Sequence, residues 1–154
     1  MPTITPYLWF DTRAEEAMQF YTSIFKDSRV LSVSRAGDKA MTVQFELQGQ
    51  KFIGLNAGMT GPEFTFNDSV SFLISVETQS EIDYYWDRLT AGGGRESRCG
   101  WLRDKFGLAW QVVPSALGRM LTDPDPAKAQ AVMSAMLTMN KLDLAALEHA
   151  RASA

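Results

Sequence analysis

The side chains that most often do chemistry in proteins are scarce in this sequence of 154 residues. It contains one histidine, His149, and one cysteine, Cys99. A zinc cluster needs several cysteines or histidines at short spacing, and a nucleophilic triad needs a histidine beside its serine or cysteine. His149 lies near the end of the sequence, so it could serve such a site only if that end folds back. A lone cysteine also rules out a disulfide within the chain.

The charge balance argues against two further classes of function. Fifteen basic and 18 acidic residues give a formal net charge of −3, and no basic run could follow a phosphate backbone, so we expect no nucleic-acid partner. No apolar run approaches the roughly 18 residues that span a bilayer, and the first residues lack the features of a signal peptide. We therefore expect a single cytoplasmic domain with no membrane partner.

The chemistry must then come from side chains that a β-rich scaffold positions. Residues 4–10 (ITPYLWF) predict a strand, since they are rich in β-branched and aromatic types. Thr12 and Glu15 have the spacing of a capping box at the start of an amphipathic helix. Further strands are predicted at residues 29–34, 40–47 and 50–56, of which the last two form a hairpin.

The same order of elements begins again near residue 70. Apolar and mainly polar residues alternate along this strand: Val70, Phe72, Ile74 and Val76 against Ser69, Ser71, Leu73 and Ser75. Thr78 and Glu81 repeat the capping box 66 residues after Thr12, and the helix behind it ends at three glycines, residues 92–94. Strands at residues 96–103 and 108–113 complete the second copy. The repeat predicts an internal duplication of a βαβββ unit.

Beyond Pro114 the pattern becomes helical. Helices are predicted over Ser115–Leu121 and residues 127–139, and leucine spacing continues into a last helix that carries His149. These Met-rich helices are typical of a packing surface, either on their own chain or on a second subunit. We divide the chain into module one (residues 1–57), a linker (58–67), module two (68–114) and a C-terminal helical extension (115–154).

Four stretches of the sequence resemble a known family. They are TPYLWFDTRAEEAMQFYTSIF, FNDSVSFLISVETQSEIDYYWDRL, CGWLRDKFGLAWQVVP and DPDPAKAQAVMSAMLTMNKLDL. These stretches are similar to the PhnB-like group, often labelled 3-demethylubiquinone-9 3-methyltransferase, in the vicinal oxygen chelate superfamily of glyoxalase, bleomycin-resistance and dioxygenase proteins. The resemblance implies an α+β, glyoxalase-like fold: two tandem βαβββ modules form a U-shaped mixed sheet around a small-ligand cavity, with C-terminal helices added.

The resemblance also implies a divalent metal in active relatives. Side chains on the first strand of each module and a carboxylate on the last strand hold it. The corresponding positions here are Pro6, Ser69 or Ser71, and Gln111. Proline has no donor side chain, and hydroxyls and amides are poor ligands for a transition metal. We therefore expect no resident metal or other cofactor, although carbonyl oxygens and Gln111 could hold a divalent cation weakly.

Strand alternation assigns side chains to the cavity face. Cys99 joins this set because it shares a face with Trp101 if their strand is regular. The cavity candidates are Leu8, Phe10, Ser69, Ser71, Leu73, Ser75, Cys99, Trp101 and Gln111. The aromatic residues expected on the opposite, helix-facing side are Tyr7, Trp9, Tyr85, Trp86 and Trp110. The alternative is a closed core in which the serines bond to one another or to water.

An apolar cup with a few neutral polar groups suits a small organic ligand. The first hypothesis is therefore a small-molecule-binding homodimer without the usual metal centre, in which Arg103 could reach an anionic ligand. The first alternative is an enzyme, a lyase, isomerase or transferase that uses Gln111, the serines, Cys99 or a loop carboxylate. A methyl donor typically binds a glycine-rich turn between a strand and a helix, whereas glycines 92–94 follow a helix. The second alternative is an interaction protein that uses the extension.

Overall fold

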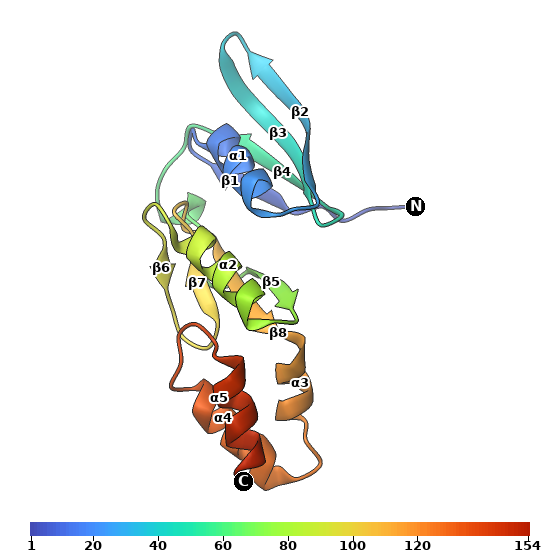
Figure 1. Ribbon diagram of the computed structural model, residues 1–154. Coiled ribbons are helices and arrows are strands. Elements are labelled where there is room, and N and C mark those ends of the chain that lie inside the picture. Colours follow the sequence, from blue (N-terminus) through green and yellow to red (C-terminus); the bar gives the residue numbers. More distant parts are fainter. The chain divides into compact units, whose positions relative to one another are not determined.

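The computed structural model describes residues 1–154, which form two compact units, Met1–Thr65 and Phe66–Ala154. The first unit is a four-stranded sheet with one helix packed on it (Figure 1). Its elements are β1 (Tyr7–Phe10), α1 (Ala14–Ile24), β2 (Ser28–Ala36), β3 (Lys39–Leu47), β4 (Gln50–Asn56) and the short 3-10 helix η1 (Pro62–Phe64). The sheet order is β1-β4-β3-β2, with β1 parallel to β4 and the other neighbours antiparallel. The predicted βαβββ order is confirmed.

Helix α1 covers one face of this sheet because its apolar residues recur on one side. The residues that it buries are Ala14, Ala17, Met18, Tyr21 and Ile24. Gly54 on β4 lets the layers approach closely, since a Cβ there would lie 3.0 Å from Val43 Cγ2 and 3.3 Å from Phe10 Cε2. The same Cβ would lie 3.4 Å from Ala14 Cβ. Phe10 therefore lies between the sheet and α1, in the core of the first unit.

The capping box predicted for α1 is wrong. The helix begins after Arg13, whose side chain makes no cap bond and instead pairs with Glu16. The Ala14 N–H donates to Asn56 Oδ1 at 2.8 Å. The cap thus comes from β4, which is a tertiary contact that local sequence spacing could not indicate.

The second unit repeats the plan, with its second, third and fourth strands shorter than those of the first unit. Its first part consists of β5 (Ser71–Val76), α2 (Gln79–Thr90), β6 (Arg95–Glu96), β7 (Trp101–Arg103) and β8 (Ala109–Pro114). The sheet order is β5-β8-β7-β6, with β5 parallel to β8. The capping box predicted here is confirmed, because the Thr78 side chain accepts from the Glu81 N–H and the Glu81 carboxylate accepts from the Thr78 N–H. The two sheets give the mixed-sheet, two-module α+β architecture that the sequence predicts.

The single strand predicted over residues 96–103 is wrong, because the chain turns in the middle of it. Cys99 has φ 59° and Gly100 has φ 86°, both in the left-handed region that interrupts a strand. β6 and β7 pair antiparallel on either side of this turn, and the Ser97 N–H donates to the Trp101 carbonyl at 2.9 Å. The turn removes Cys99 from the face that Trp101 occupies.

A buried carboxylate shapes the connection between β7 and β8. Asp104 lies in the turn between β7 and β8, and its side chain is buried. It accepts from the N–H groups of Phe106 at 2.9 Å and Leu108 at 3.0 Å, and from Trp110 Nε1 at 2.9 Å. These bonds satisfy a charge that would otherwise be costly to bury, and they fix the register of β8 against β7.

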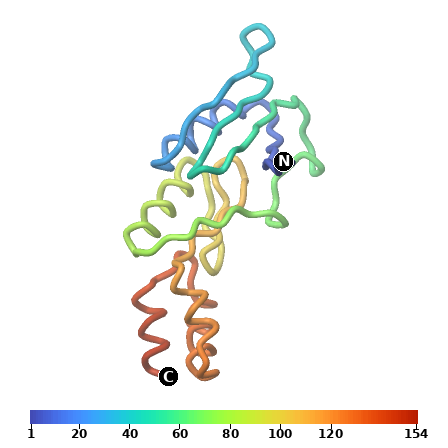
Figure 2. The backbone as a smooth tube through the Cα atoms, turned by 90° about the vertical axis from the view of Figure 1, so that its right-hand side faces the viewer, coloured from blue at the N-terminus to red at the C-terminus, as the bar shows by residue number.

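The extension forms three helices at one end of the second unit (Figures 1 and 2). They are α3 (Ser115–Leu121), α4 (Pro126–Met136) and α5 (Leu144–Ala152). The bounds of α3 match the prediction, whereas α4 ends three residues before the predicted residue 139. Their own core contains Leu117, Met120, Val132, Leu142 and Leu147. None of the helices of the chain combines the length and apolar character needed to cross a membrane.

Hydrogen bonds fasten the extension to the second sheet and to α2. Gln79 Nε2 donates to the Leu142 carbonyl at 3.0 Å, and its Oε1 accepts from the Leu144 N–H at 2.8 Å. The Cys99 and Gly100 N–H groups each donate at 2.8 Å, to the carbonyls of residues 139 and 140 respectively. The extension thus packs on its own second module.

We predict that Thr78→Ala lowers the free energy of unfolding by about 1 kcal/mol, the usual loss for an N-cap side chain. Thr12→Ala is the matched control, since Thr12 has the same sequence spacing but does not cap its helix. We expect the control to change stability by less than about 0.5 kcal/mol. Urea denaturation followed by circular dichroism measures both values, and equal losses would contradict the assignment of the caps.

Candidate functional site

Each sheet has one face covered by its helix and one face that points away from it, here called the open face. On the second sheet, Leu102, Trp110 and Val112 are buried on the helix-covered side. Side chains alternate along a strand, so their neighbours in sequence lie on the open face. The open face of the second sheet therefore carries Ser71, Leu73 and Ser75 of β5, Ala109, Gln111 and Val113 of β8, Trp101 and Arg103 of β7, and Arg95 of β6.

Strand register arranges these side chains in two rows. Arg95 lies opposite Arg103, Arg103 opposite Ala109, and Ala109 beside Ser71. In the next row, Trp101 lies opposite Gln111, which is beside Leu73. Gln111 Nε2 donates to Ser71 Oγ at 2.9 Å and links the two rows. The bond orients the Gln111 amide, so its carbonyl oxygen is held in place as an acceptor.

A charged pair borders the first row. Arg103 Nε donates to Asp68 Oδ1 at 2.9 Å. This bond lowers the pKa of the Asp68 carboxyl below its ordinary value and raises the pKa of the Arg103 guanidinium. The charge of Arg95 lowers the pKa of Asp68 further, although its effect is smaller. Both Asp68 and Arg103 are thus charged at neutral pH.

The first sheet places different residues on its open face from those predicted. Leu8 and Phe10 are buried on the helix-covered side, beneath α1. Tyr7 is 56% exposed, and Trp9 lies on the same side of β1 as Tyr7. The predicted faces of β1 were therefore reversed. The strand is apolar on both sides, so alternation alone could not tell which side α1 covers.

Trp9 has an unused hydrogen-bond donor. Its ring stacks on Phe64 of η1, with centroids 5.1 Å apart and planes 19° apart. Its Nε1 is buried and has no hydrogen-bond partner. The neighbours across the sheet, Leu55 opposite Trp9 and Ile53 opposite Tyr7, carry no acceptor in their side chains. A ligand oxygen that reached this indole would satisfy a donor that now lacks a partner.

Two predicted candidates of the second module lie off the open face. Ser69 is in the turn before β5, where its N–H donates to Asn67 Oδ1 at 2.8 Å. Cys99 directs its Sγ toward the Met136 carbonyl of α4, 3.6 Å away. The predictions that place Ser71, Leu73, Ser75, Trp101 and Gln111 on one face agree with the strand register. Whether any of these residues binds a ligand remains a prediction.

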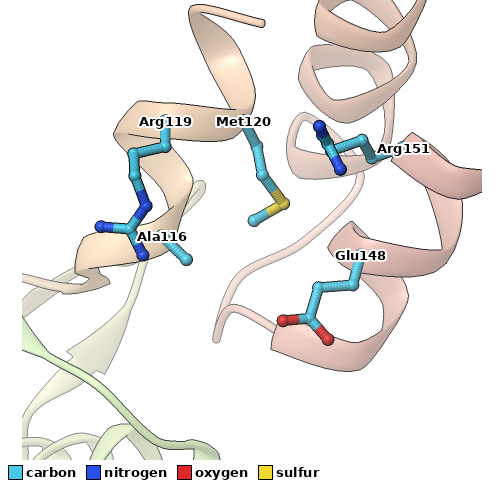
Figure 3. Close-up of a pocket in the computed structure, with 5 residues that line it drawn as sticks. All are labelled: Ala116, Arg119, Met120, Glu148 and Arg151. Atoms are coloured by element: carbon cyan, nitrogen blue, oxygen red, sulfur yellow. The ribbon is translucent and has the colours of Figure 1, made fainter.

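One pocket lies in the extension, between α3 and α5 (Figure 3). It has a volume of about 340 Å³ and is lined by Ala116, Arg119, Met120, Glu148 and Arg151. Arg151 Nε donates to Asp123 Oδ2 at 2.6 Å, so one of its two arginines is already neutralised. Figure 3 shows Arg119 of α3 and Glu148 of α5 on opposite sides of the Met120 side chain. No predicted site residue lines this pocket.

The family model described as 3-demethylubiquinone-9 3-methyltransferase matches residues 2–113. The chain belongs to this family. A solved structure from Bacillus cereus is titled as a putative 3-demethylubiquinone-9 3-methyltransferase and PhnB protein, so the family is PhnB-like. That protein is 32% identical to this chain, with a TM-score of 0.68. The match covers 74% of this chain and 100% of that one. No curated protein matches the chain.

More distant structures share the fold. Protein PA1353 from Pseudomonas aeruginosa is 19% identical with a TM-score of 0.58, over 74% of this chain and 98% of that one. A glyoxalase-related enzyme from Fulvimarina pelagi is 13% identical with a TM-score of 0.51, over 76% of this chain and 91% of that one. The PhnB-like chain thus shares its fold with a glyoxalase-related enzyme. The family match ends at residue 113, so the helical extension lies outside it.

The residues of this PhnB-like chain do not fit the metal that the resemblance to the vicinal oxygen chelate superfamily implies. Pro6 offers only its carbonyl, which already accepts from the Ile53 N–H at 3.1 Å. Ser71 Oγ is engaged by Gln111, and both groups are neutral. The last strand of the first module places Ile53 and Leu55 on its open face, and neither side chain has an atom that could ligate a metal. No group of three or more His, Cys, Asp or Glu side chains in the chain is arranged to hold a metal ion.

Two features of this PhnB-like site escaped the sequence analysis. Arg95 belongs to a two-residue strand, so its position opposite Arg103 depends on a register that no local pattern indicates. Trp9 was assigned to the helix-facing side by strand alternation, with the two faces of β1 reversed. Gly54 could have indicated the correct face of β1. It is the one residue of β4 without a side chain, and it lies where α1 approaches the sheet.

We predict that Trp9→Phe costs less stability than Trp86→Phe by about 1 kcal/mol or more, the usual value of one hydrogen bond. The Trp9 Nε1 has no partner to lose, whereas Trp86 Nε1 donates to Glu96 Oε1 at 2.7 Å. Urea denaturation of both variants measures the difference. An equal or larger loss for Trp9→Phe would show that its indole N–H is satisfied in solution.

Proposed function

We propose that this PhnB-like protein binds small organic molecules on the open face of either sheet and holds no tightly bound metal ion. The observation that carries the proposal is the neutral donor set at the superfamily's ligand positions. Those positions are occupied by Pro6, Ser71 and Gln111. A divalent transition metal prefers imidazole, thiolate or carboxylate ligands, and none of these is present there.

The open face of the second sheet supports binding of a partly apolar molecule. Leu73 is 59% exposed in the middle of β5. It lies in the same row of the sheet as Trp101, and Gln111 lies between them. The amide of Gln111 is oriented by Ser71 and can accept a hydrogen bond from a ligand. Apolar walls with a few fixed polar groups are the usual composition of small-molecule sites.

The first sheet supports the same proposal from different residues. The indole of Trp9 offers a flat apolar surface and an unpartnered donor. Buried donors without partners are rare in proteins because each one costs free energy. A ligand with an acceptor oxygen near an aromatic or aliphatic body would use both properties of Trp9.

The enzyme hypothesis has less support than binding alone. Cys99, the only thiol, is directed toward α4 and not toward the open face. The glycines at 92–94 end α2 and do not join a strand to a following helix, so they do not support a methyl-donor site there. Gln111 and Ser71 are the polar candidates left for lyase, isomerase or transferase chemistry. Turnover that Gln111→Ala abolishes without a change in the unfolding midpoint would favour this alternative.

We also propose that the protein acts as a homodimer in the cytoplasm. Support for the dimer comes from apolar side chains exposed on the hairpin of β2 and β3, namely Val30, Leu31 and Met41. The acidic composition with one free cysteine is consistent with a reducing compartment. A sedimentation-equilibrium mass equal to one chain would contradict the dimer.

We predict that calorimetric titration with Mn²⁺, Ni²⁺ and Zn²⁺ detects no site of micromolar or tighter affinity. The reason is the absence of charged or imidazole ligands at positions 6, 71 and 111. Protein purified without chelator should also contain less than one equivalent of metal by elemental analysis. One equivalent bound with micromolar affinity, and lost in Gln111→Ala, would overturn this part of the proposal.

We predict that Leu73→Ser weakens binding of the neutral fluorescent probe N-phenyl-1-naphthylamine about tenfold, since a contacting leucine contributes on the order of 1.5 kcal/mol. Leu137→Ser is the matched control, because Leu137 of the extension is 53% exposed and lies outside the proposed site. The control should change probe affinity by less than about twofold. Equal effects of the two variants, or no saturable binding at all, would contradict binding on the second open face.

A further inference from the structure

Two arginines face each other directly across β6 and β7. Arg95 is the register partner of Arg103 in this antiparallel pair. The adjacent pair, Glu96 and Leu102, belongs to the helix-covered side, because Glu96 accepts from Trp86 of α2 and Leu102 is buried. Alternation therefore places both arginines on the open face.

This arrangement is unfavourable for the fold alone. Directly opposed residues of an antiparallel pair have Cβ atoms about 4.5–5.5 Å apart, and like charges there destabilise the sheet. Only Asp68 offsets them, through its bond to Arg103 Nε at 2.9 Å. Arg95 makes no ion pair or hydrogen bond. Two positive charges and one negative charge leave one positive charge uncompensated.

The contact with Asp68 also orients Arg103 for recognition. It uses the Nε side of the guanidinium, and no other hydrogen bond engages the two terminal nitrogens. A guanidinium held in this way can present its remaining N–H groups as a fork to two oxygens of one anion. Arg95, directly opposite, can add a further contact to the same anion.

The rest of the open face indicates what would accompany the anionic group. Ala109, the next residue in the row after Arg103, has the smallest side chain there and is buried. The next row contains Trp101, Gln111 and Leu73. The Trp101 ring is large and flat, and arginine and aromatic side chains together are well suited to an aromatic acid.

We propose that Arg95 and Arg103 bind the anionic oxygens of an aromatic or partly apolar acid whose body lies on Trp101 and Leu73. This inference deepens the proposed function and rests on it, since it names the chemical class of the small molecule. The single uncompensated charge matches a monoanion, such as a carboxylate or a sulfonate.

A pair of probes tests the inference. The neutral probe N-phenyl-1-naphthylamine and the anionic probe 8-anilinonaphthalene-1-sulfonate share one aromatic framework and differ by a sulfonate. Both increase in fluorescence when they bind an apolar surface. We expect the full-length protein to bind the anionic probe at least fivefold more tightly, and Arg103→Gln to remove that preference while affinity for the neutral probe changes less than twofold.

Arg98→Gln is the matched control, because Arg98 lies in the exposed turn between β6 and β7 and its removal changes the net charge equally. It should leave the preference for the anionic probe within twofold of the unmodified protein. If Arg98→Gln and Arg103→Gln have the same effect, the preference reflects overall charge and the inference is wrong. Arg103→Lys, which keeps the charge but loses the fork, should weaken anionic binding by about threefold.

Arg95→Gln keeps the test independent of any folding defect. The Arg95 side chain makes no hydrogen bond or ion pair, so its replacement should leave the unfolding midpoint nearly unchanged while weakening anionic binding about fivefold. Unchanged anionic binding in folded Arg95→Gln and Arg103→Gln would overturn the inference but leave the proposed function intact. Loss of saturable binding of the neutral probe by the unmodified protein would instead refute the proposed function.

Discussion

The burial of one face of each four-stranded sheet beneath a single helix is the constraint on which the rest of this structure depends. Side chains alternate along a strand, so a helix that claims one set of residues leaves the other set available. Phe10 packs against α1 over Gly54, and Trp9 must therefore point the other way. In the second unit, burial of Leu102 and Trp110 leaves Trp101 and Gln111 on the open face. The proposed binding surface is thus determined by which residues the helices bury.

The fold was predictable where a local pattern had only one structural solution. In β5, serines alternate with bulky residues, which identifies the buried side without any knowledge of the helix. The capping box at Thr78 forms as predicted, because Thr78 and Glu81 bond to each other's backbone N–H groups at the start of α2. The identical spacing at Thr12 is not used, since Asn56 supplies the acceptor from another strand. Local spacing cannot distinguish these two cases because the difference lies in a contact 42 residues away in sequence.

The site was less predictable than the fold, for reasons that differ from residue to residue. Strand β1 is apolar on both sides, so only the packing of α1 decides the direction of Trp9. Cys99 adopts a left-handed conformation that is uncommon for a residue other than glycine, and the strand expected around it divides there. Arg95 and Arg103 become neighbours only through the register of a short hairpin. Each error arose from a tertiary or backbone constraint, and none arose from misjudged residue chemistry.

The attachment of the helical extension has a consequence for where this protein can be divided. The match to the family model ends at residue 113, yet the turn before β7 depends on groups contributed after it. A Cβ on Gly100 would lie 3.1 Å from Leu142 Cδ1 and 3.0 Å from the Val112 carbonyl oxygen. Gly100 therefore packs closely against both the extension and the sheet. The segment that matches the family model and the compact unit that contains its second half therefore end at different residues, 113 and 154. A chain cut at the shared boundary would expose the Cys99 and Gly100 amides beside Trp101, at the edge of the surface proposed to bind the ligand.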